Sequence, residues 1–133
     1  MEKIFIILAF TLFATQAHSQ TVPGAVVHAM ENGDVKELMP YLNSTIELQL
    51  DGEMQMSSKN HTQRQLQDFF KKHKPDSFSI NYEGEKNGSY YGMGTLITKK
   101  GSYKVNMYFL NTTKNPLIYY LNCIDLRLEK NCK

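Results

Sequence analysis

The chain has 133 residues, 41% of them hydrophobic, and 15 basic side chains against 13 acidic ones give a formal net charge of +2. This length suffices for one domain with a packed core but not for two. The small charge and a single basic run at residues 71–74 do not indicate nucleic acid or an acidic membrane surface as a partner. We therefore expect a single domain that binds no nucleic acid.

The first 19 residues have the parts of a cleavable export signal. Lys3 supplies a positive charge, residues 4–13 form an almost uninterrupted apolar run, and Ala17 and Ser19 give the small-x-small spacing of a signal-peptidase site. The run is too short for a membrane-spanning helix, which needs about 20 apolar residues. We expect cleavage after Ser19, with Ala17 as the alternative, leaving one domain at residues 20–133.

The predicted cleavage site has no cysteine near it, so the bacterial lipoprotein type of attachment is excluded. We expect a soluble protein in the periplasm or the medium, with no membrane attachment after the signal is removed.

Two short helices are predicted at the start of the mature chain. Pro23 opens the first helix, and Gly33 has the position of its C-cap. Asp34 then caps a second helix, with Glu37 three residues on in a capping-box-like pair. Pro40 must kink or end this helix, because proline removes a backbone donor and clashes with the preceding turn.

A hairpin and a third helix follow. Strict alternation around the turn signal Asp51-Gly52 predicts two short strands within residues 45–56. The serines at 57–58 cap a helix that runs to about His73. Its apolar stripe consists of Leu66, Phe69, Phe70 and His73.

The rest of the chain has the pattern of a four-strand antiparallel meander. The alternating segments are residues 78–82, 90–98, 103–109 and 117–128. Gly92 and Gly94 lie inside the second strand, where glycine permits strong bending or the close approach of another backbone. Because helices and strands are segregated, we predict an α+β fold in which one strongly bent antiparallel sheet packs on three N-terminal helices.

Several short motifs also follow one another in a characteristic order. They are Glu31–Leu38 with Tyr41-Leu42, Ser58-Lys59, Asp68-Phe69-Phe70, Lys72-His73 with Pro75, Ser77-Phe78, Gly94-Thr95-Leu96, Gly101 with Tyr103, and Leu126–Glu129. Their order resembles the nuclear-transport-factor-2-like superfamily, and within it a group of small exported bacterial proteins of unknown function. The resemblance covers residues 23–129 and implies a cone-shaped sheet around a cavity, often a dimer, and no assigned activity.

The superfamily includes polyketide cyclases and ketosteroid isomerases, and the isomerases use acids inside the cone. Strict alternation places Ile124, Leu126 and Leu128 on the inner face of the last strand, so we predict that Asp125 and Glu129 point outward. With no acid predicted inside, we expect no catalytic or cofactor-binding residue. The expected function is a non-catalytic module that binds a ligand or a protein.

The alternative function is a cavity enzyme of the isomerase or cyclase type that acts on a small apolar molecule. Two or more acids or histidines that converge on the cavity would favour this alternative. His28 and His73 lie near helical core faces, where histidine is usually a packing residue.

Met54, Met56 and His61 have side chains that suit Cu(I). Two methionines at positions i and i+2 of a short strand are more simply explained as core residues, so we predict that they face the core and that the chain has no metal site.

Cys123 and Cys132 form a candidate disulfide, because an exported protein keeps such bonds. A bridge needs Cα atoms within about 7 Å, so the last strand must end by about Arg127 and the tail must fold back across the outer face. Free thiols and an intermolecular link are the alternatives.

Two tyrosines are candidates for an interface. Tyr108 and Tyr120 alternate opposite to the nearest core positions, on strands that are rich in tyrosine. We expect them to contact a second copy of the chain, and we expect a small apolar ligand in the cone.

Overall fold

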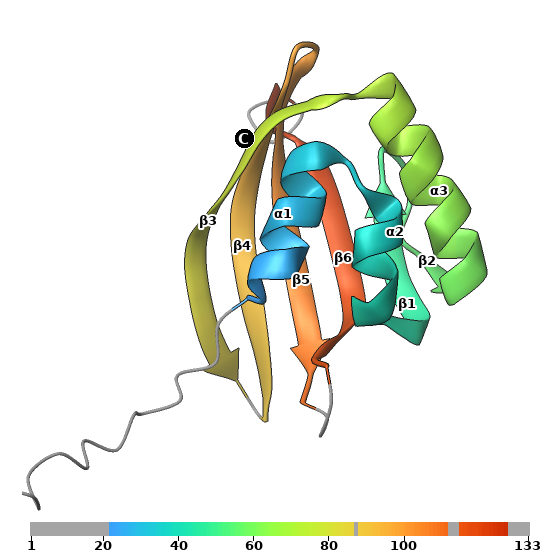
Figure 1. The fold of residues 1–133 in the computed structure, drawn as a ribbon, viewed down its shortest axis with the longest axis vertical. Coiled ribbons are helices and arrows are strands. Elements are labelled where there is room, and N and C mark those ends of the chain that lie inside the picture. Colours follow the sequence, from blue (N-terminus) through green and yellow to red (C-terminus); the bar gives the residue numbers. More distant parts are fainter. Residues whose placement is uncertain (1–21, 87, 112–114, 128–133) are drawn as a thin grey trace, which may run out of the picture.

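A computed structural model describes residues 22–86, 88–111 and 115–127 (Figure 1). Within these ranges no helix is long and apolar enough to cross a membrane. The predicted export signal lies outside them, as do Leu128, Glu129 and Cys132.

The helices begin and end where local signals predict. They are α1 (Gly24–Asn32), α2 (Val35–Leu38), the 3-10 turn η2 (Met39–Tyr41) and α3 (Lys59–Lys72). Gly33 ends α1 with a left-handed φ of 65°, and the Asp34 side chain accepts a hydrogen bond from the Glu37 backbone N–H. Pro40 lies in the turn that ends α2, and the Ser58 hydroxyl caps α3 by accepting from His61.

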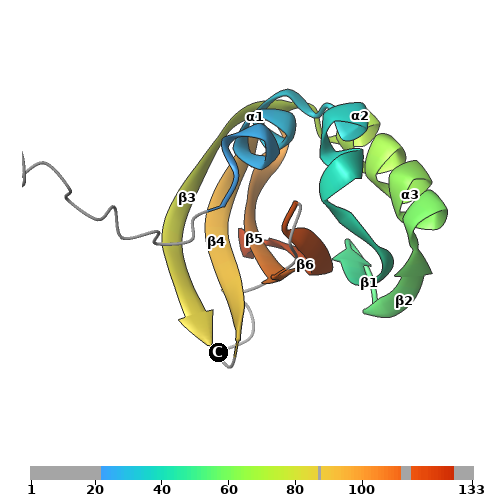
Figure 2. The ribbon, with the colours of Figure 1, turned by 60° about the horizontal axis from the view of Figure 1, so that its bottom comes forward.

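Six strands form one sheet, which curves around the helices (Figure 2). They are β1 (Leu42–Leu50), β2 (Gln55–Ser58), β3 (Pro75–Lys86), β4 (Ser89–Thr98), β5 (Gly101–Leu110) and β6 (Leu117–Asp125), in the spatial order β2-β1-β6-β5-β4-β3. The pairings from β3 to β6 are antiparallel, and so is the pairing of β1 with β2, but β1 pairs with β6 in parallel. The predicted α+β cone is therefore confirmed, with one parallel pairing between the hairpin and the meander.

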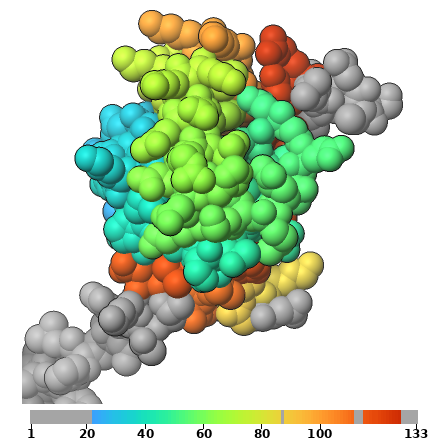
Figure 3. All heavy atoms as spheres, turned by 90° about the vertical axis from the view of Figure 1, so that its right-hand side faces the viewer, coloured from blue at the N-terminus to red at the C-terminus, as the bar shows by residue number. Residues whose placement is uncertain are grey.

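The core lies between the concave face of the sheet and the helices. Side chains from α1, from the predicted stripe of α3 and from alternate positions of the central strands are buried there: Met30, Leu66, Phe69, Phe70, Leu96, Val105, Met107, Phe109 and Leu121. Figure 3 shows α3 across the middle of one side of the molecule, between α1–α2 and the β1–β2 hairpin. These side chains form the hydrophobic core between the sheet and the helices.

An extra residue in β6 reverses the predicted inner face of that strand. Ile118 pairs with Phe109 and Tyr120 pairs with Tyr108, so Tyr119 has no partner in the ladder and forms a bulge. One added residue shifts every later side chain to the opposite face, because side chains alternate with a period of two.

The bulge corrects the prediction for Asp125. Leu121 and Cys123 are buried in the core, and Asp125 follows on the same face, opposite the buried Tyr103. The prediction that Asp125 points outward and Ile124 inward is therefore wrong.

The glycines of β4 permit close approach, as predicted. A Cβ atom on Gly94 would overlap the Ser79 carbonyl oxygen and lie 2.9 Å from the Phe78 ring, whereas one on Gly92 would overlap only the Val22 side chain. A backbone carbonyl in a paired strand cannot move aside as a side chain can.

We therefore expect Gly94→Ala to lower the free energy of unfolding of residues 20–133 by about 2 kcal/mol, the usual scale of overpacking. Gly92→Ala should cost clearly less, because the Val22 side chain can turn away. Urea denaturation of both variants measures the difference. A stabilised Gly94→Ala variant, as strand propensity alone would predict, contradicts this account.

Candidate functional site

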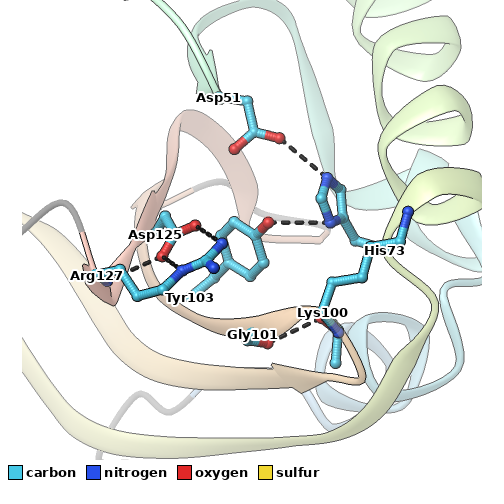
Figure 4. Close-up of polar contacts among 8 residues, drawn as sticks. Asp51, His73, Lys100, Gly101, Tyr103, Asp125 and Arg127 are labelled. Carbon is cyan, nitrogen blue, oxygen red and sulfur yellow. Dashed lines mark hydrogen bonds and ion pairs between the residues drawn. The ribbon is translucent and has the colours of Figure 1, made fainter.

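Polar side chains from four segments meet at one end of the sheet (Figure 4). Asp51 lies in the β1–β2 turn, His73 at the C-terminal end of α3, Tyr103 near the start of β5, and Asp125 with Arg127 at the end of β6. The curvature of the sheet and the direction of α3 bring these segments together.

His73 contacts two of these segments through its ring nitrogens. Its Nδ1 forms a hydrogen bond of 3.0 Å with the Tyr103 hydroxyl, and its Nε2 lies 3.2 Å from Asp51 Oδ2, within ion-pair distance. Its ring also packs against Phe69, with centroids 4.8 Å apart. The packing role predicted for His73 is confirmed, and a hydrogen-bond relay accompanies it.

Tyr103 is the buried end of this relay, with 2% of its surface exposed. Burial raises the pKa of Tyr103 to about 12, and the nearby carboxylates of Asp51 and Asp125 raise it as well. The hydroxyl therefore keeps its proton at neutral pH and remains a donor to His73.

Asp125 is neutralised by its neighbour Arg127. The Arg127 backbone N–H and Nε donate to Oδ1 at 2.9 and 3.2 Å, and Nη2 donates to Oδ2 at 2.9 Å. These hydrogen bonds lower the pKa of the Asp125 carboxyl. Asp125 is thus an ion-paired acid and has both oxygens occupied.

A pocket of about 270 Å³ lies between the β1–β2 turn and the end of β6. Its lining residues are Gln49, Asp51, Gly52, Cys123, Ile124 and Asp125. Burial raises the pKa of the Cys123 thiol to about 12, so this side chain is a small apolar wall and not a nucleophile at neutral pH.

The disulfide prediction is altered by the position of Cys123. The strand ends at Asp125, early enough for the tail to turn back, but Cys123 is buried on the inner face. A tail that crosses the outer face cannot reach its sulfur, so that route is wrong. Cys132 lies outside the described residues, and the bond itself stays a prediction.

The two predicted interface tyrosines lie on the convex face of the sheet. Tyr108 and Tyr120 are directly paired across β5 and β6, with ring centroids 4.9 Å apart. Cross-strand pairing extends their row over all six strands: Met56, Glu47, Tyr120, Tyr108, Tyr91 and Gly84. We call these six residues the outer row.

The predictions that the two methionines and His28 pack in the core are wrong, because these side chains are exposed. Met56 is 66% exposed and Met54 is also exposed, so they do not face the core. His28 projects into solvent, where its Nδ1 lies 2.6 Å from Glu37 Oε1, a bond that raises its pKa. In the described parts of the chain no three His, Cys, Asp or Glu side chains are grouped so that they could hold a metal ion.

We expect Tyr103→Phe to lower stability at pH 7 by about 1 kcal/mol, because it leaves His73 Nδ1 without its donor. A tyrosine whose pKa is raised on folding contributes stability that is complete below its unfolded pKa of about 10 and is lost as pH rises toward 12. The variant should therefore lose less stability than the wild type over this range, as urea denaturation at each pH would show.

Tyr90→Phe is the matched control for that change. Burial raises the pKa of Tyr90 to about 12 too, but its ring stacks on Phe109 and makes no contact with His73. Tyr90→Phe should reduce the loss of stability above pH 10 without lowering the stability at pH 7. Curves for Tyr103→Phe and wild type that run parallel above pH 10 would contradict the assignment.

Comparisons with known proteins agree with the fold. Residues 23–123 match the family model described as a domain of unknown function, DUF4783. A crystal structure of a DUF4783 family protein from Bacteroides ovatus is 27% identical, with a TM-score of 0.75 over 80% of this chain and 97% of that chain. Another from Bacteroides fragilis is also 27% identical, with a TM-score of 0.74 over 79% and 99% of the two chains.

A more distant likeness agrees with the fold alone. An NTF-2 like protein of unknown function from Silicibacter pomeroyi is 13% identical, with a TM-score of 0.55 over 76% of this chain and 87% of that chain. No curated protein matches. The predicted resemblance is therefore confirmed: the chain has the nuclear-transport-factor-2-like fold and belongs to the DUF4783 family.

Proposed function

We propose that the mature protein is an exported, non-catalytic interaction module that forms a homodimer through the convex face of its sheet. The proposal of export depends on the charge, the apolar run and the small-x-small site within the first 19 residues. The proposal of a dimer depends on the outer row and its surroundings.

Several large apolar side chains are exposed on the convex face of the sheet. Met56, Tyr82, Ile97, Tyr108 and Leu110 are all exposed and all occupy outward positions of their strands. The helices cover the opposite face (Figure 2). A sheet face that carries several exposed apolar side chains favours an interface with another protein.

A second copy of the chain is the partner that fits this face best. On the four central strands, the outward positions with a charged side chain are Glu47 and Lys104, and the remainder are aromatic, apolar or uncharged polar. Depletion of charge with enrichment of tyrosine is the composition of an interface core. A two-fold pair brings the same patch from both copies together, which requires no complementary charges.

The convergence of Asp51, His73 and Asp125 is the arrangement that favours the cavity enzyme as a second candidate function. Yet both His73 nitrogens and both Asp125 oxygens have partners within the protein. Tyr103 donates to His73 and does not face the pocket freely. Because a general acid or base must reach a substrate proton, we propose binding and not proton transfer at this pocket.

We expect Tyr108→Lys to weaken the dimer by about 100-fold or more, since two copies of a charged side chain would be buried at its centre. Sedimentation velocity over a range of concentrations should show a dimer for the wild type and a monomer for the variant. Gln67→Lys adds the same charge on the exposed surface of α3 and should leave the dimer intact.

A thermal melt of each variant separates loss of dimer from loss of fold. A wild-type protein that stays monomeric at tens of micromolar, or a Tyr108→Lys variant that remains dimeric, would remove the basis for the proposal.

A further inference from the structure

The polar side chains that line the pocket at the end of the sheet differ in how many contacts they make within the protein. The Asp125 carboxylate receives three hydrogen bonds from Arg127. Gln49 is also engaged through both side-chain atoms, because its Nε2 donates to the Gly52 carbonyl at 2.6 Å and its Oε1 accepts from Asn122 at 2.6 Å. Each polar atom of these two side chains already has a partner within the protein.

Asp51 differs from these two residues. Its Oδ2 lies 3.2 Å from His73 Nε2, and neither oxygen receives a hydrogen bond from any residue that the structure describes. The side chain is 42% exposed and lines the pocket. An ionised carboxylate has acceptor capacity for about four hydrogen bonds, so Asp51 retains most of its capacity.

The position of Asp51 is also fixed in advance. His73 holds one carboxylate oxygen, and the buried Tyr103 hydroxyl holds His73 in turn at 3.0 Å (Figure 4). A binding group that is already ordered loses little entropy when a ligand arrives, which raises affinity. Tyr103 and His73 can therefore serve to order Asp51 for binding, which requires no proton transfer.

The remaining walls of the pocket are apolar. Cys123 and Ile124 line the pocket from adjacent positions of β6, whose side chains lie on opposite faces of the sheet. A site with one ordered carboxylate and a short apolar wall is complementary to one cationic donor on a small apolar body.

We propose that this pocket binds a small primary ammonium compound, with its nitrogen on Asp51 and its carbon chain against Cys123 and Ile124. Asp51 lies in the β1–β2 turn and outside the outer row, so the proposal does not depend on the homodimer. Its volume of about 270 Å³ suits a short alkyl chain better than a steroid-sized molecule.

The first experiment compares n-butylammonium with n-butanol, which has nearly the same shape but no charge. Each is titrated into reduced, isotope-labelled residues 20–133 at low salt and pH 7, and amide shifts are followed by NMR. Butylammonium should give saturable shifts at Gly52, Ile124 and Asp125 with a Kd in the millimolar range, about what a ligand of five heavy atoms can achieve. Butanol should give none that saturate.

The second experiment tests the carboxylate. Asp51→Asn keeps the shape and leaves a side-chain oxygen that can accept from His73, yet it removes the charge, so affinity for butylammonium should fall at least tenfold. Asp68→Asn removes the same charge from the exposed surface of α3 and should leave affinity unchanged.

Equal saturable binding of butanol, unchanged affinity in Asp51→Asn, or the absence of saturable shifts at the pocket amides would each overturn the proposal. If Asp51→Asn does not fold, the comparison of the two probes on the wild type decides alone. The dimer is measured separately by sedimentation, so failure here leaves that proposal standing.

Discussion

The bulge at Tyr119 is the constraint on which both faces of the sheet depend. Without it, strict alternation from Ile118 would place Tyr120 in the core and Asp125 on the surface. With it, Tyr120 joins the outer row, and Asp125 faces the inner side beside Tyr103. One inserted residue thereby adds Tyr120 to the aromatic convex face and brings an acid to the pocket, two features that a regular strand could not offer together.

The sequence predicts the elements of this fold well because their signals are local. Gly33, Asp34, Pro40 and Ser58 act within one turn of where they stand, and the stripe of α3 repeats within its own helix. The bulge leaves no such local mark, since Tyr119 resembles the residues around it. The parallel pairing of β1 with β6 is equally hidden, because it joins segments about 70 residues apart in the chain.

The same limit explains which site residues were missed. Asp51 has the pattern of a turn residue and His73 that of a packing residue, and each is one. Their second role arises only where the turn, the end of α3 and the start of β5 meet (Figure 4). A residue that satisfies a local rule gives no sign in the sequence of a further long-range contact, so inspection of single segments could not find the relay.

Cys123 connects the pocket to the question of export. Cys123 is buried on the inner face and is one of the residues that line the pocket. With the thiol free, burial keeps it protonated and inert, and the pocket stays available even in an oxidising compartment.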